Sequence, residues 1–192
     1  RGTARTLDDS GVPRPGTGIE QVELDFAAPE LTVLTNSLNQ RTTYLHTRIH
    51  GEPRLLEAIG PGCARCGETH MRYQYDARGR LMRITQRDPA GQPRATTTLK
   101  RDAAGRMLRK SVQLFGGAKP LPERLLARYE YADNSPRPAL ITRPSVVPGR
   151  EHRLRFTYND AGQITRLVET GFSPLDADGE PIDDPSLATP IE

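Results

Sequence analysis

The sequence predicts an all-β protein built from antiparallel β-hairpins, and a repeated turn motif is the main reason. In this motif Asp or Asn is followed by two residues and then by Gly or Asn. The first side chain can bond the backbone two residues on, and Gly at the fourth position tolerates positive φ, which closes a type I turn with a bulge. The motif occurs at Asp76–Gly79, Asp88–Gly91, Asp102–Gly105, Asn159–Gly162 and Asp176–Gly179, and in a looser form at Asn36–Asn39.

Composition supports the same fold class. The chain has 192 residues, enough for one or two domains, and only 35% of them are hydrophobic, which is lean for a compact core. Its 17 Gly and 17 Pro residues suit a protein of strands and turns. No apolar run approaches the roughly 18 residues of a membrane span, and no signal peptide is visible. Because the chain begins without Met, we interpret it as a fragment whose targeting signals lie outside it.

Elements can be assigned from the N-terminus onward. Residues 1–18 are rich in Gly and Pro and predict a flexible lead-in. Alternation of Val22, Leu24 and Phe26 with polar residues predicts a half-buried strand. Further strands are expected over Leu31–Thr35 and Thr42–Ile49, and Pro53–Ile59 fits either a strand or a helical turn. Pro120–Arg128 interrupts the strand pattern, and Glu123–Ala127 within it fits one helical turn.

The clearest pattern lies in the middle and C-terminal parts of the chain. Met71, Tyr73 and Tyr75 alternate with polar residues, so one face of a strand is apolar. Four hairpins are expected, near residues 73–85, 99–112, 129–143 and 156–168. Residues 172–192 predict an acidic, Pro-rich loop or a truncated next repeat.

These hairpins recur with a period. When they are aligned on the second aromatic position, equivalent residues fall at 75, 101, 131 and 158, spaced by 26, 30 and 27 residues. Self-similarity at this spacing is typical of repeat architectures, in which each unit stacks on its neighbours. A lone hairpin buries too little to be stable. We therefore expect each apolar face to be covered by the next unit or by something held inside.

The repeat carries a family resemblance. The stretch from Tyr73 to Thr85 reads Tyr-x-Tyr-Asp-x-x-Gly-Arg-Leu-x-x-Ile-Thr and resembles the YD repeat of the Rhs family. The stretch from Phe156 to Ile164 is a second match, and Asp102 to Met107 is a partial one with Arg101 in place of the tyrosine. The resemblance covers roughly residues 30–171, and the YD repeat also occurs in insecticidal toxin-complex proteins and in teneurins.

The resemblance implies part of a spiralling β-sheet shell that encloses a C-terminal toxin domain for delivery in competition between bacteria, often by type VI secretion. The implied partners are the remainder of the shell, the enclosed toxin and secretion-spike or chaperone proteins, and the implied location is secreted or at the bacterial cell surface. The self-cleaving aspartyl-protease region of such families has no match, because Asp184-Pro185 lacks the glycines that follow there. A non-enzymatic structural role is therefore expected, and a cell-surface adhesion or glycan-binding module is the alternative.

No catalytic or cofactor-binding residues are expected, because the acidic residues of the repeat occupy turn positions. The expected structural signature comprises Tyr73, Tyr75, Asp76, Gly79, Asp102, Gly105, Tyr129, Tyr131, Phe156, Tyr158, Asn159 and Gly162.

Charge is unevenly distributed. Residues 65–110 contain twelve Lys or Arg against four acids, and residues 169–192 contain seven acids and no Lys or Arg. Because the arginines of the basic region alternate with apolar residues, a solvated outer face explains them, and we expect no specific nucleic-acid partner.

Zinc is a weaker hypothesis. His46, His50, Cys63, Cys66 and His70 have zinc-finger spacing in reverse order. Within a strand, however, His46 and His50 would lie about 13 Å apart, at roughly 3.3 Å per residue. If a metal binds, its ligands are Cys63, Cys66 and His70. Otherwise Cys63 and Cys66 form a disulfide or remain two thiols, because a redox motif would open a helix.

Overall fold

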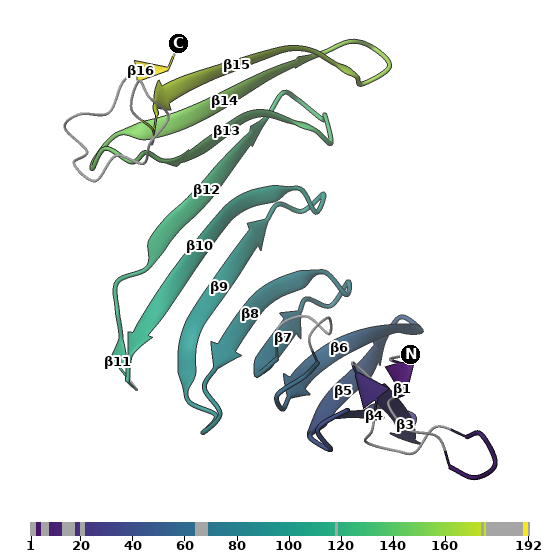
Figure 1. Ribbon diagram of the computed structural model, residues 1–192. Coiled ribbons are helices and arrows are strands. Elements are labelled where there is room, and N and C mark those ends of the chain that lie inside the picture. Colours follow the sequence, from purple (N-terminus) through teal and green to yellow (C-terminus); the bar gives the residue numbers. More distant parts are fainter. Residues whose placement is uncertain are drawn as a thin grey trace. The chain divides into compact units, whose positions relative to one another are not determined.

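The prediction of an all-β fold built from antiparallel hairpins is confirmed. The computed structural model describes residues 3–4, 8–12, 18–19, 22–63, 69–117, 119–173, 175 and 190–191. Every regular element in these ranges is a strand (Figure 1), and the neighbouring strands pair in antiparallel fashion.

The chain divides into two units, and strands β9 and β10 contribute residues to both. Unit 1 contains β1 (Thr3–Ala4), β2 (Gly18–Ile19), β3 (Val22–Ala28), β4 (Leu31–Asn36), β5 (Arg41–Ile49), β6 (Glu52–Ile59), β7 (Met71–Tyr75), β8 (Leu81–Arg87) and β11 (Lys119–Pro120). Unit 2 contains β12 (Arg124–Tyr131), β13 (Pro138–Pro144), β14 (Glu151–Tyr158), β15 (Ile164–Phe172) and β16 (Pro190–Ile191). The shared strands are β9 (Pro93–Arg101) and β10 (Met107–Gly116).

In unit 1 the strands from β3 to β8 lie in chain order, each paired with the one before it (Figure 1). Residues directly opposite each other on paired strands point to the same face of a sheet. Leu34 is opposite Thr42, Ala58 is opposite Met71, and Tyr73 is opposite Ile84. These residues define the tyrosine face of unit 1, which also carries Tyr44 and Tyr75, and the opposite face is its arginine face, which carries Glu57, Arg72 and Arg87.

Unit 2 repeats this division. The residues of β10 from Arg109 to Val112 pair with β12, and β13, β14, β15 and β16 follow in order. Tyr129 is opposite Ile141, Ile141 is opposite Leu154, and Phe156 is opposite Leu167. The tyrosine face of unit 2 consists of these residues together with Tyr131 and Tyr158, and its arginine face carries Arg128, Thr142, Arg153, Arg155 and Arg166.

Neither of the two segments for which a helical turn was considered is helical. Pro53–Ile59 belongs to β6, and the helical turn considered for Glu123–Ala127 is wrong because that segment runs into β12. In β12 the half-buried Leu125, the buried Ala127 and the half-buried Tyr129 alternate with exposed residues. This period of two matches one covered face of a strand.

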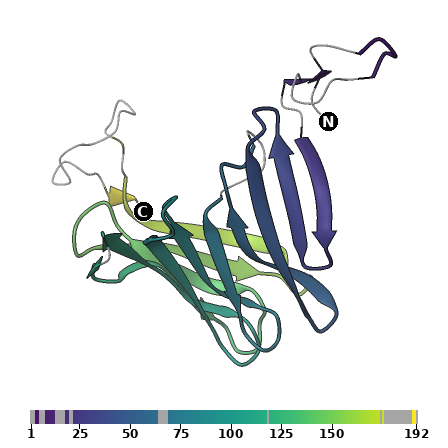
Figure 2. The same ribbon diagram turned by 90° about the horizontal axis from the view of Figure 1, so that it is seen from below.

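Strands β3 to β8 of unit 1 lie side by side in one sheet, as do strands β12 to β16 of unit 2, and Figure 2 shows the purple and blue strands of unit 1 as a single layer. Few apolar side chains are therefore buried. Leu34, Ala58, Met71, Leu99 and Ala127 are buried among the described residues, whereas Ile164 is 56% exposed and Leu167 is 53% exposed. Hydrogen bonds between strands and contacts between neighbouring side chains hold these sheets, rather than a core between two layers.

The two ends of the chain are described only in part. Within the lead-in expected at residues 1–18, β1 pairs with β2, and the Asp8 carboxylate accepts hydrogen bonds from the backbone N–H groups of Ser10 and Val12. Of the C-terminal region expected at 172–192, β16 pairs with the end of β15, and the Asp176–Gly179 motif lies outside the described residues.

Candidate functional surface: the joints between hairpins

The repeated turn closes on its first residue. In the turn that starts at Asp76, the Oδ1 atom accepts hydrogen bonds from the backbone N–H groups of Arg78 and Arg80, both at 2.9 Å. The N–H of Gly79 donates to the carbonyl of Asp76 at 2.9 Å, and Gly79 has a φ of 73°. The same backbone bonds recur in the turns that begin at Asn36, Asp88, Asp102 and Asn159.

The motif extends to a fifth residue that sequence reasoning missed. In the turns that begin at Asp76 and Asp102 the carboxylate binds the Arg at the fifth position, and in those that begin at Asn36 and Asn159 the amide binds Gln. These pairs are Asp76–Arg80 at 2.7 Å, Asp102–Arg106 at 2.6 Å, Asn36–Gln40 at 3.0 Å and Asn159–Gln163 at 3.0 Å. The pairing is visible in the sequence once the turns are aligned, because these partners directly follow the fourth residue. The turn at Asp88 differs, because its fifth residue is Gln92 and, among the described residues, the Asp88 carboxylate accepts only the backbone N–H of Gln92.

These bonds favour the ionised form of both aspartates. The backbone N–H of Arg80, followed by the Arg80 guanidinium, lowers the pKa of Asp76. For Asp102 the guanidinium of Arg106 is the largest cause of the lowered pKa. Both carboxylates therefore act as hydrogen-bond acceptors in turns.

We call the contact between one hairpin and the next hairpin along the sheet a joint. In three joints the second tyrosine of the repeat forms an equivalent hydrogen bond. Its hydroxyl donates to a backbone carbonyl of the preceding hairpin. The three bonds are Tyr75 to Leu55 at 2.8 Å, Tyr131 to Met107 at 2.8 Å and Tyr158 to Pro138 at 2.9 Å. Burial raises the pKa of Tyr75 and of Tyr131, because the charged phenolate would lose hydration there.

In each of these three joints a basic side chain of the earlier hairpin also contacts the turn of the later hairpin, in the opposite direction to the tyrosine bond. In unit 1, Arg54 Nε donates to the Gly79 carbonyl at 3.2 Å, and the ring N–H of His50 donates to the Ala77 carbonyl at 2.7 Å. These bonds connect the β5–β6 hairpin to the turn of the β7–β8 hairpin.

Arg106 makes the most extensive of these contacts in unit 2. Its Nη1 atom donates to the carbonyls of Asp133 at 2.8 Å and Ser135 at 3.1 Å, in the turn between β12 and β13. Its guanidinium also lies 4.8 Å from the centre of the Tyr131 ring, a cation–π geometry. Arg106 thus binds its own turn through Asp102 and the following hairpin through three groups.

Arg137 occupies the corresponding place in the last joint. A Cβ atom added to Gly162 would lie 2.1 Å from Arg137 Nη1, so the guanidinium rests directly on that glycine. Gly162 has a φ of 75°. Glycine is needed there for two reasons, because the backbone is left-handed and the Arg137 side chain fills the space above it.

The second repeat departs from the pattern at Arg101, which replaces the tyrosine. Its Nη1 atom donates to the Gly105 carbonyl at 3.1 Å, within its own turn, and its Nε atom is buried with no hydrogen-bond partner among the described residues. A buried donor without a partner costs free energy. With Arg101 in place of the tyrosine, the hydrogen bond between hairpins is therefore replaced by one within the turn of Arg101 itself.

The arginine faces carry paired charges. Glu57 lies 3.5 Å from Arg72 and 3.4 Å from Arg87, across β6, β7 and β8. In unit 2, Glu151 lies 2.6 Å from Arg153 and 3.8 Å from Arg128. Such exposed pairs add little stability, about 0–1 kcal/mol each. They are consistent with the solvated face that the alternation of arginines predicts.

His152 has a partner that sequence reasoning did not find. Its Nε2 atom lies 2.6 Å from Glu169 on the neighbouring strand β15. The two residues are 17 positions apart, so the pair depends on the register of β14 and β15, which no local motif indicates.

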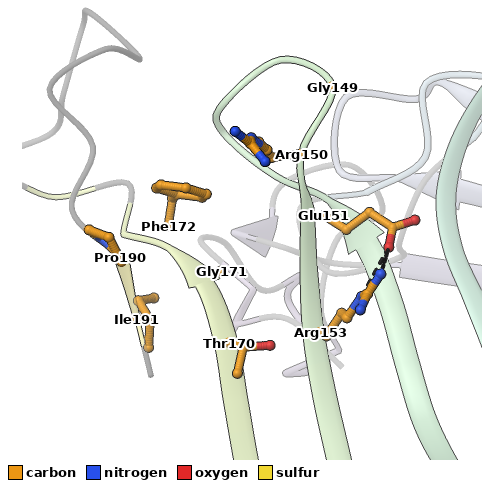
Figure 3. Close-up of a pocket in the computed structure, with 9 residues that line it drawn as sticks. All are labelled: Gly149, Arg150, Glu151, Arg153, Thr170, Gly171, Phe172, Pro190 and Ile191. Carbon is orange, nitrogen blue, oxygen red and sulfur yellow. Dashed lines mark hydrogen bonds and ion pairs between the residues drawn. The ribbon is translucent and has the colours of Figure 1, made fainter.

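Each unit has a pocket on its described surface. A pocket of 520 Å³ in unit 2 has Arg150 and Phe172 on opposite sides, and its Glu151 and Arg153 are bonded to each other (Figure 3). A pocket of 560 Å³ in unit 1 is lined by Asp88, Gln92, Pro93, Arg94, Leu114, Phe115, Gly117 and Leu121. Neither pocket contains a residue of the expected repeat signature.

The residues considered for zinc do not form a metal site among the described residues. Cys63 is disulfide-bonded, and Cys66, the other cysteine of the sequence, lies outside the described residues. His70 precedes β7 with a φ of 55°, and its carbonyl accepts a hydrogen bond from Arg87. His46 is in strand β5. In the part of the chain that the structure describes, no three His, Cys, Asp or Glu residues are grouped to hold a metal ion.

No helix among the described residues is long and apolar enough to cross a membrane. No protein-family model matches the chain, and no curated protein matches it either.

Proposed function

We propose that this chain is a wall segment of an Rhs-type shell, which encloses a C-terminal toxin domain for secretion and delivery in competition between bacteria. The observation that carries the proposal is the joint. Three joints share a tyrosine bond in one direction and a basic side chain in the other. A unit that recognises the next copy of itself on the same chain is what an extended wall requires.

The single-layer sheets also support a wall. A compact enzyme of this size would bury many apolar side chains in one core. Here Ile164 and Leu167 are about half exposed on the tyrosine face of unit 2. Side chains of this kind are suited to contact further protein, either other parts of the wall or an enclosed domain.

The glycan-binding alternative would use exposed tyrosines. The hydroxyls of Tyr75, Tyr131 and Tyr158 are each bound to a backbone carbonyl instead. The structure gives no specific observation that favours adhesion, so the wall remains the proposed function.

Protease protection tests the proposal. The natural protein that carries this chain should protect a downstream domain from digestion, whereas the same domain expressed alone should be cut rapidly. Weakening a joint with Arg106→Ala should expose the domain, and Arg80→Ala, which removes the equivalent turn pair without a joint contact, should not. Equal digestion of the domain in both settings, or retention of this chain alone on a glycan array, would refute the wall.

A further inference from the structure

The first exposed sheet edge is strand β3. It pairs with β4 on one side, and no described strand pairs with it on the other. Leu24 is 52% exposed and Phe26 is 75% exposed, and Glu23 and Asp25 are exposed as well. The strand is seven residues long and contains neither Pro nor Lys, two of the residues that protect sheet edges. It does carry the acids Glu23 and Asp25, and its pairing with β4 shifts register after Asp25, so we expect its free edge to accept a partner strand that brings a basic side chain to Asp25.

The second exposed edge is strand β15. It pairs with β14, and on its other side β16 covers only Gly171 and Phe172. The preceding residues Ile164, Arg166 and Leu167 are exposed. Arg166 makes no ion pair with any described residue, in contrast to Arg153 on the neighbouring strand.

The side chains of the two edges match face by face. Leu24 is opposite Leu34 and therefore lies on the tyrosine face, so Asp25 points to the other face. On β15, Leu167 lies opposite Phe156 on the tyrosine face, and Arg166 points to the arginine face. An antiparallel register that places Asp25 opposite Arg166 also places Leu24 opposite Leu167.

We propose that β3 is a strand-addition site for β15 of a second copy of this chain, in that register. Charge selects this partner over the symmetric alternatives. Pairing β3 with β3 around Leu24 would place Glu23 of each copy opposite Asp25 of the other, and like charges directly opposite are destabilising. Pairing β15 with β15 would bring no acid to Arg166, because Val168 and Thr170 share its face.

The contact joins β3 of one copy to β15 of the other. After each addition, one β15 edge and one β3 edge therefore stay free at the two ends of the assembly. Such a head-to-tail contact generates open chains unless a ring closes. This inference depends on the two edge strands alone and is measured on this chain by itself, so its failure would leave the proposed wall function untouched.

Sedimentation velocity across a range of protein concentrations tests the proposal. The average mass of the wild-type chain should rise steadily beyond that of a dimer. Asp25→Lys and Arg166→Glu should each shift association to about five- to tenfold higher concentration. The double variant Asp25→Lys/Arg166→Glu should restore it, as should an equimolar mixture of the two single variants.

Matched charge reversals away from the two edges, Glu130→Lys in β12 and Lys100→Glu in β9, should have no effect. Disulfide trapping gives a second measurement, in which Leu24→Cys mixed with Leu167→Cys should cross-link between chains and neither variant alone should do so. A monomer at all concentrations, a species that stops at a dimer, or association that survives both single reversals would overturn the proposal.

Discussion

Arg106 provides the sharpest test of the joint. The substitution Arg106→Ala removes an ion pair within its own turn and three contacts with the next hairpin. Arg80 occupies the same position in an equivalent turn and has the same aspartate partner. The two side chains are similarly covered, at 24% and 29% exposed. Arg80→Ala is therefore a matched control that removes the turn pair and no other side-chain contact with the described residues.

The difference between the two variants isolates the joint. Two hydrogen bonds to the carbonyls of Asp133 and Ser135 contribute about 1 kcal/mol each. The cation–π contact with Tyr131 adds about 0.5–1 kcal/mol at a partly exposed site. Because the ion pair is lost in both variants, Arg106→Ala should destabilise the β12–β13 hairpin by about 2–3 kcal/mol more than Arg80→Ala destabilises its own turn.

Hydrogen exchange measured by mass spectrometry gives the local readout. An added opening free energy of this size should speed the exchange of amides in Arg124–Pro144 by about 30- to 150-fold. Amides of β4 and β5 should exchange at the wild-type rate in the same protein. Equal acceleration around the substituted turns of Arg106→Ala and Arg80→Ala would show that Arg106 acts only within its own turn, and the joint would be refuted.

Three further predictions concern other parts of the repeat. Tyr158→Phe should lower the free energy of unfolding by about 1 kcal/mol in chemical denaturation. Tyr129→Phe should leave it unchanged, because the Tyr129 hydroxyl has no hydrogen bond in the described structure. Similar losses in the two variants would contradict the role of the tyrosine bond. Gly162→Ala should lower the melting temperature more than Gly91→Ala, because both glycines have positive φ but only Gly162 lies under an arginine; adding Arg137→Ala should abolish the difference. The pKa values of Asp76 and Asp102 are lowered from the ordinary 3.8. Their stabilising effect is therefore present above about pH 4 and is lost as the pH falls through the lowered folded-state pKa. The melting temperature should drop as the pH falls below about 4, and Asp76→Asn/Asp102→Asn should flatten that drop.

The turns could be predicted from sequence because their chemistry is local. Asp76 bonds backbone groups two and four residues away, so a short motif contains the whole interaction. The alternation of Tyr73 and Tyr75 likewise predicted one face of a strand and hence the antiparallel hairpins. The helical turn considered at Glu123–Ala127 was wrong because neighbouring strands, rather than the short segment itself, determine the conformation of β12.

The joints could not be predicted in the same way. Tyr131 is 24 residues from Met107, and Arg106 is 27 residues from Asp133. These pairs depend on the register between strands, and β10 and β12 shift register at a bulge between Lys110 and Ser111. A motif identifies the second tyrosine as special, but only the positions of neighbouring hairpins show what its hydroxyl binds.

The joints that are held from both sides have a mechanical consequence. A hairpin at the end of the sheet can detach only if its own tyrosine bond and the basic contact from the preceding hairpin break together, because both contacts cross the same joint. Force applied along the sheet, from one strand to the next, should therefore peel the chain in discrete steps of one hairpin. The released length should correspond to the spacing of 27 to 30 residues between the equivalent positions 101, 131 and 158.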